Sequence, residues 1–290
     1  MADISGKTKL LCVIGSPIEH SMSPAMHNEA IRLLGLDYVY TAFDVSEENT
    51  ENAINSLKLL GAAGCNVTMP GKTKALQMAD EATKVARLSG AANTIVFKNG
   101  KILADSTDGR GFTDSLRRQG EGVKGNTITI LGAGGAARAI IAQCAVDEAA
   151  KVRIFRREGA AFKETERFAD LLNKETKCNV TVTDIADAAA LKAAIDESIC
   201  LLNATNVGMH PDDTGCLIED DDMLRSDLIV GDLVYNPEET VLLSKARNKG
   251  CRIITGKSVL LYQGAAAFEK FTGQMMPVDE VSKNVFGRDL

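Results

Sequence analysis

Two ionisable side chains, Lys72 and Asp108, stand where helices are predicted to begin. A cation is electrostatically unfavourable at a helix N-terminus, because the helix dipole already places partial positive charge there. Its position therefore favours a functional role for Lys72, although most lysines are simply solvated. Asp108 has the alternative role of a helix N-cap. Both residue types can transfer a proton to or from a reacting group, so the pair is a candidate for acid–base chemistry.

Other polar residues gather at the ends of predicted strands. Ser21 and Ser23 flank one Met at a strand-to-helix junction, where hydroxyls and helix N–H groups could converge on a carboxylate. N-capping is an equally good role for Ser23. Asn66 and Thr68 alternate at a strand end and so face the same side.

The segment Gly132-Ala133-Gly134-Gly135-Ala136, the glycine loop, follows a strand-like run and precedes an Ala-rich helix. In such loops one glycine makes the tight turn and another lets the backbone approach a pyrophosphate. The helix N-terminus then supplies N–H groups and a favourable dipole. The strand-loop-helix context predicts nucleotide binding at this loop.

The end of the next predicted strand carries Arg156, Arg157 and Glu158. An acidic residue there favours the ribose 2′-hydroxyl of NAD, whereas an arginine suits the 2′-phosphate of NADP. The sequence supplies both types, so this segment leaves the choice of cofactor open. The same charges could also face solvent at the start of a helix.

The elements that must position these residues alternate between strand-like and helix-like segments almost throughout the chain. Runs such as 10–14, 65–68 and 127–131 indicate strands, and Asn99-Gly100 is a strong signal for a two-residue hairpin turn. This alternation predicts mostly parallel sheets with helices on both faces. A chain of 290 residues is expected to form two domains.

Bulk composition narrows the functional classes. The net charge of −6 argues against a nucleic-acid binder, and no apolar stretch reaches the roughly 18 residues of a membrane span. Seven Cys without metal-ligand spacing favour reduced thiols and a cytoplasmic protein. The three His also lack ligand spacing, so no metal site is predicted.

Taken in order, these segments resemble the shikimate dehydrogenase family over nearly the whole chain, and most closely its quinate/shikimate branch. The motifs that carry the resemblance are His20–Asn28, Asn66–Lys72, Ala92–Thr94, Thr107–Phe112, Asn203–Met209, Asp232–Pro237 and Gln263–Ala265. The resemblance implies a two-domain α/β fold. A substrate domain with a mostly parallel sheet is expected at 1–106 and 241–290, and a Rossmann-type dinucleotide-binding domain at 107–240.

The resemblance also implies roles at the matching positions. Lys72 and Asp108 would be the catalytic pair. The substrate-binding residues would be Ser21, Ser23, Tyr40, Asn66, Thr68, Asn93, Tyr235 and Gln263. The cofactor-binding residues would be the glycine loop with Arg156, Arg157, Glu158, Thr205, Asn206 and Gly256.

The implied reaction is reversible oxidation of shikimate to 3-dehydroshikimate with NAD or NADP, and of quinate to 3-dehydroquinate as well. NAD is expected to serve at least as readily as NADP. A quinate-preferring enzyme and a non-catalytic cofactor- or metabolite-binding protein are the alternatives. A small-molecule substrate and a homodimer are expected, without nucleic acid or membrane partners. Three departures from the family pattern are Ser106, Phe155 and Val259.

Overall fold

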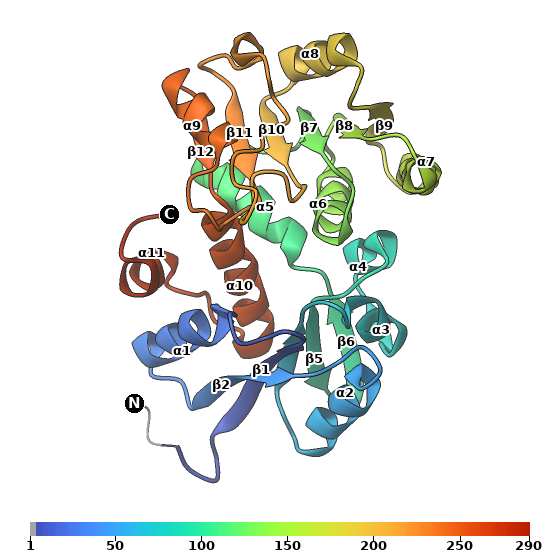
Figure 1. Ribbon diagram of the computed structural model, residues 1–290. Helices are drawn as coiled ribbons and strands as arrows, with labels where there is room; N and C mark the ends of the chain where they lie inside the picture. The colour runs from blue at the N-terminus through green and yellow to red at the C-terminus, as the bar shows by residue number, and fades with distance from the viewer. Residues whose placement is uncertain (1–3) are drawn as a thin grey trace. The chain divides into compact units, whose positions relative to one another are not determined.

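The computed structural model describes residues 4–290, and the chain divides into two compact units (Figure 1). Unit 1 contains the chain up to Gly111 together with Leu261–Leu290, and unit 2 is Phe112–Leu260. The predicted boundary at 240/241 differs from this division. Strand β12 (Arg252–Ile254) pairs with β11 (Ile229–Asp232) in unit 2, so the chain returns to unit 1 only within the last long helix.

Unit 1 is built on a six-stranded mixed sheet with the order β2-β1-β3-β5-β6-β4. Its first three strands are parallel, and β5 and β6 form an antiparallel hairpin that also pairs with β3. The strands are β1 (Lys9–Gly15), β2 (Tyr38–Asp44), β3 (Gly64–Val67), β4 (Glu81–Ala82), β5 (Thr94–Lys98) and β6 (Lys101–Asp105). The predicted hairpin turn is confirmed, because Asn99 and Gly100 both have positive φ, of 52° and 75°.

Helices of unit 1 connect the strands and cover the sheet. They are α1 (Ser23–Leu34), α2 (Thr50–Leu59), α3 (Lys72–Gln77), α4 (Lys84–Ser89), α11 (Val278–Val281) and the π-helix η2 (Ser282–Phe286). Helices α5 (Asp108–Arg118) and α10 (Gly256–Thr272) contain the two boundaries between the units. One face of the sheet forms a core in which Cys12 and Ile14 of β1 pack with Ile54 and Leu57 of α2.

Unit 2 has a fully parallel six-stranded sheet with the order β12-β11-β10-β7-β8-β9. This is the doubly wound order of dinucleotide-binding domains, and it reverses direction between β7 and β10. The remaining strands are β7 (Thr127–Leu131), β8 (Lys151–Arg156), β9 (Asn179–Asp184) and β10 (Cys200–Asn203). The helices are α6 (Gly135–Val146), α7 (Ala160–Glu175), α8 (Ala188–Glu197), α9 (Val241–Asn248) and the 3-10 turn η1 (Asp221–Met223). The Rossmann-type prediction is confirmed.

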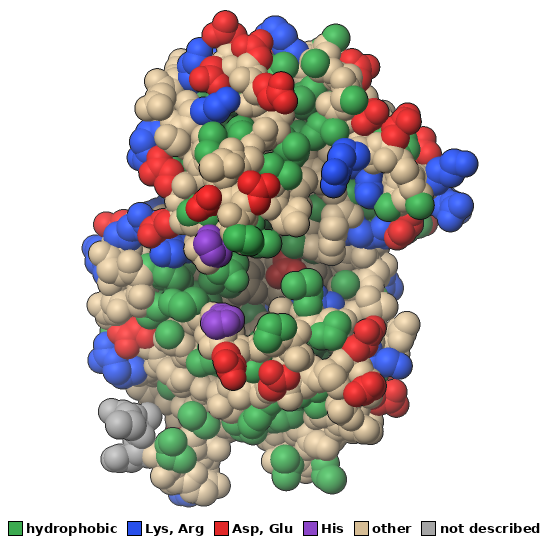
Figure 2. All heavy atoms as spheres, viewed as in Figure 1, with side chains coloured by type: hydrophobic (Ala, Val, Ile, Leu, Met, Phe, Trp, Pro, Cys, Tyr) green, Lys and Arg blue, Asp and Glu red, His purple; other side chains and the backbone are tan. Residues whose placement is uncertain are grey.

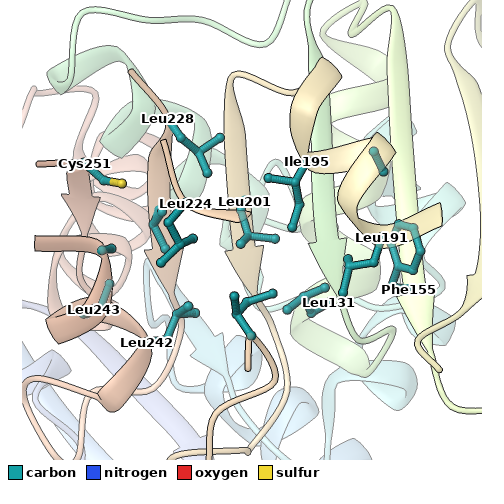
Figure 3. Close-up of a cluster of buried hydrophobic side chains, with 14 residues drawn as sticks. Leu131, Phe155, Leu191, Ile195, Leu201, Leu224, Leu228, Leu242, Leu243 and Cys251 are labelled. Atoms are coloured by element: carbon teal, nitrogen blue, oxygen red, sulfur yellow. The ribbon is translucent and has the colours of Figure 1, made fainter. Parts of the chain in front are cut away.

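Figure 3 shows the apolar layer between this sheet and the helices on one of its faces. Leu131, Leu201 and Val230 come from three neighbouring strands and are fully buried. Phe155 of β8 belongs to the same cluster and is only 2% exposed. Its position is therefore structural, and the unusual Phe before Arg156 serves the core.

One edge strand of each sheet is bonded to a helix asparagine in the same way. In unit 1 the Asn28 side chain accepts from the backbone N–H of Tyr40 at 2.9 Å and donates to its carbonyl oxygen at 2.8 Å. In unit 2 the Asn173 side chain makes the same two bonds to Val180, at 2.7 and 2.9 Å. Tyr40 lies on β2 and Val180 on β9, both edge strands, so each asparagine satisfies backbone groups that face away from its sheet.

Figure 2 shows acidic and basic side chains interspersed over the visible face, without a broad region of one sign. None of the helices in residues 4–290 combines the length and apolar character that a membrane crossing requires. The same residues contain no group of three or more His, Cys, Asp or Glu placed to hold a metal ion.

Candidate active site

Lys72 and Asp108 form a close ion pair in unit 1. Lys72 is the first residue of α3 and Asp108 the first residue of α5, and Nζ lies 2.6 Å from Oδ2. Their side chains are 24% and 18% exposed, so a bound molecule can reach both. The other carboxylate oxygen of Asp108 accepts from Asn93 Nδ2 at 2.7 Å. Three separate segments thus fix one ammonium group beside one carboxylate.

Asn93 is the centre of this cluster. Its Oδ1 accepts from the backbone N–H of Thr107 at 2.7 Å and from the hydroxyl of Thr94 at 2.9 Å. Its Nδ2 also donates to Gln263 Oε1 at 3.3 Å, in addition to its bond with Asp108. The side chain is buried, and its orientation follows from its partners. Support for Asp108 therefore comes from Asn93, while Ser106 bonds through its N–H to Asp105.

Asn66 links this cluster to the interior of unit 1. Its Nδ2 donates to the carbonyl of Asn93 at 3.0 Å and to the Thr94 hydroxyl at 3.1 Å. Its Oδ1 accepts from the Tyr40 hydroxyl at 2.8 Å. Tyr40 is 2% exposed, and burial raises the pKa of its phenol well above the usual value. In this structure the Tyr40 hydroxyl supports Asn66, whereas the sequence prediction gave it a direct contact with substrate.

His27 is a buried polar residue of this unit that the sequence prediction did not place in the site. Its ring stacks on Tyr40, with the two centroids 4.2 Å apart and the planes 4° from parallel. Neither ring nitrogen has a hydrogen-bond partner, and burial lowers the imidazole pKa to about 3. His27 follows Met26 in the motif after Ser23, but its neutral, stacked state depends on residues far along the chain.

Ser21, Ser23 and Thr68 lie at the carboxyl ends of β1 and β3 in unit 1. Helix α1 begins at Ser23, and the capping residue Met22 makes no side-chain bond, so the predicted N-cap role of Ser23 is wrong. Instead the Ser23 N–H donates to Ser21 Oγ at 3.3 Å. The Ser23 hydroxyl is buried, whereas Ser21 and Thr68 are partly exposed. The two parallel strands place these hydroxyls at one edge of the sheet.

The glycine loop of unit 2 leads from β7 into α6. Gly132 has φ +98°, and a Cβ there would lie 2.7 Å from Thr205 Cγ2, so a side chain is excluded by the protein itself. Gly134 and Gly135 differ, because a Cβ on either would meet nothing within 4 Å. Gly134 precedes the first turn of α6, and no side chain caps that helix. Gly134, Gly135 and Ala136 are exposed, so the first N–H groups of α6 are open to a ligand.

Arg156, Arg157 and Glu158 follow at the end of β8, the strand beside β7. The N–H of Gly132 donates to the carbonyl of Phe155 at 2.7 Å, which joins the glycine loop to this segment. Arg156 donates through Nη1 to the Thr165 hydroxyl at 2.6 Å, while its Nε is buried without a partner. Arg157 and Glu158 are exposed.

Thr205 bonds to Asn203, which in turn bonds to the buried carboxyl group of Asp232. Its hydroxyl donates to Asn203 Oδ1 at 2.7 Å, and Asn203 Nδ2 donates to Asp232 Oδ1 at 3.0 Å. Burial raises the pKa of Asp232 to about 6, against three hydrogen bonds that lower it. Asn206 and Tyr235 are exposed in this unit, Tyr235 by 52%. The role of Tyr235 in substrate binding stays a prediction.

Gly256 stands at the start of α10. A Cβ there would lie 2.6 Å from the carbonyl oxygens of Leu233 and Val234. The glycine is thus required by backbone packing, whatever else it contacts. Val259 of the same helix is buried, with only 8% of its surface exposed.

Unit 2 fits a dinucleotide at the carboxyl ends of its strands. The uncapped N-terminus of α6 offers backbone N–H donors to an anion, and Gly134 and Gly135 leave the space beside them open. Arg156, which is only partly buried, adds a positive charge at the end of β8. The glycine loop lies at the reversal point of the strand order, where doubly wound sheets bind ligands.

Comparison with known proteins gives the family. The sequence model described as the shikimate dehydrogenase substrate binding domain matches residues 13–95, and that of the shikimate 5′-dehydrogenase C-terminal domain matches 258–285. A shikimate dehydrogenase (NADP(+)) of Streptococcus uberis is 44% identical over 286 residues, which are 98% of this chain and 97% of the relative. The chain belongs to the shikimate dehydrogenase family.

Solved structures of the shikimate dehydrogenase family agree with this fold. The Listeria monocytogenes shikimate 5-dehydrogenase in complex with shikimate and NAD has a TM-score of 0.94 and 41% identity, with 98% of each chain covered. A shikimate dehydrogenase in complex with NADP+ has a TM-score of 0.87 and 38% identity, covering 98% of this chain and 96% of its own. Family membership makes this chain an NAD(P)-dependent oxidoreductase that acts on a CH–OH group.

Proposed function

We propose that this chain is a shikimate dehydrogenase that reversibly oxidises shikimate to 3-dehydroshikimate. In this proposal unit 1 binds the substrate and unit 2 binds the dinucleotide. The observation that carries it is the Lys72–Asp108 pair, 2.6 Å apart and fixed by Asn93. The relatives named shikimate dehydrogenase, and the Listeria structure that contains shikimate, support the choice of substrate.

Lys72 acts at the oxygen of the reacting carbon. When the ketone is reduced, negative charge develops on that oxygen, and an ammonium group beside it stabilises the transition state and delivers the proton. In the oxidising direction the Lys72 amine removes the hydroxyl proton. Asp108 orients Lys72 Nζ through the 2.6 Å bond and can accept a hydrogen bond from a neighbouring substrate hydroxyl.

The other polar groups of unit 1 hold the substrate. Ser21 and Ser23 bind the carboxylate, and Thr68, Asn93 and Gln263 bind ring hydroxyls. Asn66 and Tyr40 act behind them, because their polar atoms already bond to Asn93, Thr94 and each other. This arrangement keeps Asn93 turned toward Asp108 before any substrate arrives, which lowers the cost of organising the transition state.

NAD or NADP supplies the hydride acceptor and donor of the reaction. The glycine loop and the N-terminus of α6 would hold its pyrophosphate, with Arg156, Arg157 and Glu158 at the adenosine ribose. Thr205, Asn206 and Gly256 complete the expected binding residues. Named relatives use NADP or contain NAD, so we propose that both serve here. Use of NAD at least as readily as NADP remains a prediction from the resemblance to the quinate/shikimate branch.

A steady-state assay of the oxidation, with shikimate and quinate each combined with NAD and NADP, tests this function. We expect the highest kcat/KM with shikimate and weaker turnover of quinate. A preference for quinate would replace the substrate assignment while keeping the mechanism. No turnover in any of the four combinations, with the protein folded and cofactor bound, would favour a non-catalytic binding protein.

A further inference from the structure

Arg138, Arg153 and Arg156 of unit 2 each bond to a side chain, and of these three Arg156 alone bonds to no carboxylate. Arg138 of α6 pairs with Glu164 at 3.0 Å, and Arg153 of β8 pairs with Glu197 at 2.7 Å. Arg156 has no carboxylate partner among residues 4–290, and its bonding partner is the neutral hydroxyl of Thr165 at 2.6 Å. Its positive charge is therefore available to a ligand.

Thr165 is arranged to fix that guanidinium. It lies on α7 and is 1% exposed, so its own position is set by packing. Its hydroxyl donates to the carbonyl of Ala161 at 3.0 Å, one turn earlier in the helix. With its proton so committed, the oxygen can only accept from Arg156. A flexible side chain at the end of β8 thereby becomes attached to a rigid helix.

The remaining donors of Arg156 include one that is buried and unsatisfied. Its Nε lies out of contact with solvent and has no partner in the described chain. Buried polar atoms without partners are rare in folded proteins, and each one calls for an explanation such as a ligand. Arg156 also directly follows Phe155, whose carbonyl accepts from the N–H of Gly132 in the glycine loop. The fixed guanidinium is thus part of the dinucleotide region.

We infer that Thr165 is a positioning residue for cofactor discrimination, holding Arg156 ready for the 2′-phosphate of NADP. The inference rests on the proposed function, because it needs a dinucleotide at the glycine loop. A guanidinium fixed in advance makes a bidentate bond to a phosphate at a smaller entropic cost than a free one. NAD, which has a 2′-hydroxyl at this place, gains much less from the same fixation.

The test uses Thr165→Val, which keeps the side-chain shape and removes the acceptor. Isothermal titration with adenosine 2′,5′-bisphosphate and with ADP reads binding without catalysis. We expect the bisphosphate Kd to rise about tenfold and the ADP Kd to change less than twofold, the effect of losing one well-placed phosphate contact. The KM for NADP should rise in parallel, with kcat and the KM for NAD nearly unchanged.

Two further variants separate positioning from a merely structural role. Thr165→Ser keeps the hydroxyl and should restore bisphosphate binding. Thr181→Val is the matched control, because Thr181 accepts from Arg153 Nη1 at 3.1 Å on the same sheet, and it should leave both Kd values unchanged. If Thr165→Val does not fold, Thr165→Ala replaces it.

The outcomes distinguish the inference from the proposed function. If Thr165→Val weakens the binding of both nucleotides equally, or of neither, the role of Thr165 is overturned. The proposed enzymatic function is then unaffected. Binding of ADP but not of the bisphosphate by the parent protein also overturns the role of Thr165. Failure of the parent to bind either nucleotide would instead contradict the assignment of unit 2 as the cofactor-binding part.

Discussion

The catalytic cluster of unit 1 and the glycine-loop region of unit 2 differ in how far their polar atoms are already bonded. In unit 1 the polar atoms of Asn66, Asn93 and Asp108 are bonded to one another or to neighbouring residues before a substrate is present. In unit 2 the N-terminus of α6 is uncapped and exposed, and Arg156 retains a buried donor without a partner. The first arrangement fixes a catalytic pair, and the second leaves donors free for an anion.

This difference indicates where each unit can tolerate change. A network whose members orient one another loses the position of Lys72 when any member is removed, because each bond fixes the next. An open helix N-terminus has no such internal role. A side chain placed there should therefore weaken the binding of the ligand and leave the fold intact. The predictions that follow test this contrast from the largest expected effect to the smallest.

Replacement of the catalytic lysine should have the largest effect. For Lys72→Ala we expect kcat to fall about 10²-fold or more, the usual loss when a general acid–base is removed. Lys74→Ala is the matched control, since Lys74 lies on the same helix and its amine is 3.7 Å from Glu51 at the surface. Steady-state kinetics of both variants provide the measurement. Near-normal turnover by Lys72→Ala would remove that residue from the mechanism.

Two of the buried titratable groups, His27 in unit 1 and Asp232 in unit 2, should make the stability depend on pH in opposite directions. Burial lowers the pKa of His27 in unit 1 from 6.5 to about 3. Between these two pH values the unfolded chain therefore binds more protons than the folded chain. Stability from His27 is therefore present above pH 6.5 and is lost as the pH falls. Asp232 in unit 2 has its pKa raised to about 6, so the folded chain holds a proton that the unfolded chain releases near pH 3.8. Its contribution is present below pH 3.8 and is lost as the pH rises.

The variant Asp232→Asn should isolate the second of these effects. The amide oxygen can still accept from Asn203 and Val234. The Thr240 hydroxyl now donates to the carboxylate, and in the variant the amide nitrogen can donate to that hydroxyl instead. We expect the unfolding free energy of the variant, relative to the parent, to increase by about 2–3 kcal/mol between pH 4 and pH 7. Urea unfolding at several pH values measures it. A difference that does not vary with pH would show that the Asp232 pKa is not raised.

The smallest of the three effects is expected from Gly134→Asp in the glycine loop. Gly134 has an extended backbone, with φ −72° and ψ −176°, and a Cβ there meets nothing within 4 Å. Aspartate is a good N-cap, so stability should rise by a few tenths of a kcal/mol. The added carboxylate would repel the pyrophosphate, and the Kd for ADP should increase about tenfold.

Gly132→Ala provides the contrast to that variant. Gly132 needs positive φ and lies against Thr205, so alanine should destabilise the fold itself. Thermal unfolding and ADP titration of both variants separate the two roles. A loss of stability in Gly134→Asp, or unchanged nucleotide binding, would contradict the assignment of an open anion site.

Local pattern predicted much of the fold. The glycine loop, the Asn99-Gly100 turn and the strand at 127–131 depend on neighbouring residues, and the structure contains all three. The predicted boundary at 240/241 differs from the division between Leu260 and Leu261, because the latter reflects the pairing of β12 with β11, a contact that no local pattern encodes. In the same way, Lys72 and Asp108 were singled out by their places at helix starts, but the bond between them joins residues 36 apart.

The supporting residues were harder to find for the same reason. Thr165 is an ordinary residue within an amphipathic helix, and its significance appears only when Arg156 from β8 reaches it. Tyr40 was assigned to substrate, but its hydroxyl meets Asn66, 26 positions later. His27 gave no distinct signal, because its stack on Tyr40 depends on α1 packing over β2.

The paired asparagines at the sheet edges have a consequence for association between molecules. A second copy could add a strand beside Tyr40 or Val180 only by displacing a side-chain amide that already makes both bonds. Exposed edge strands are the usual starting points of aggregation, and here a helix asparagine already occupies the backbone groups of one residue in each of these two strands. The two asparagines thus make uninterrupted pairing of a second copy along β2 or β9 less favourable.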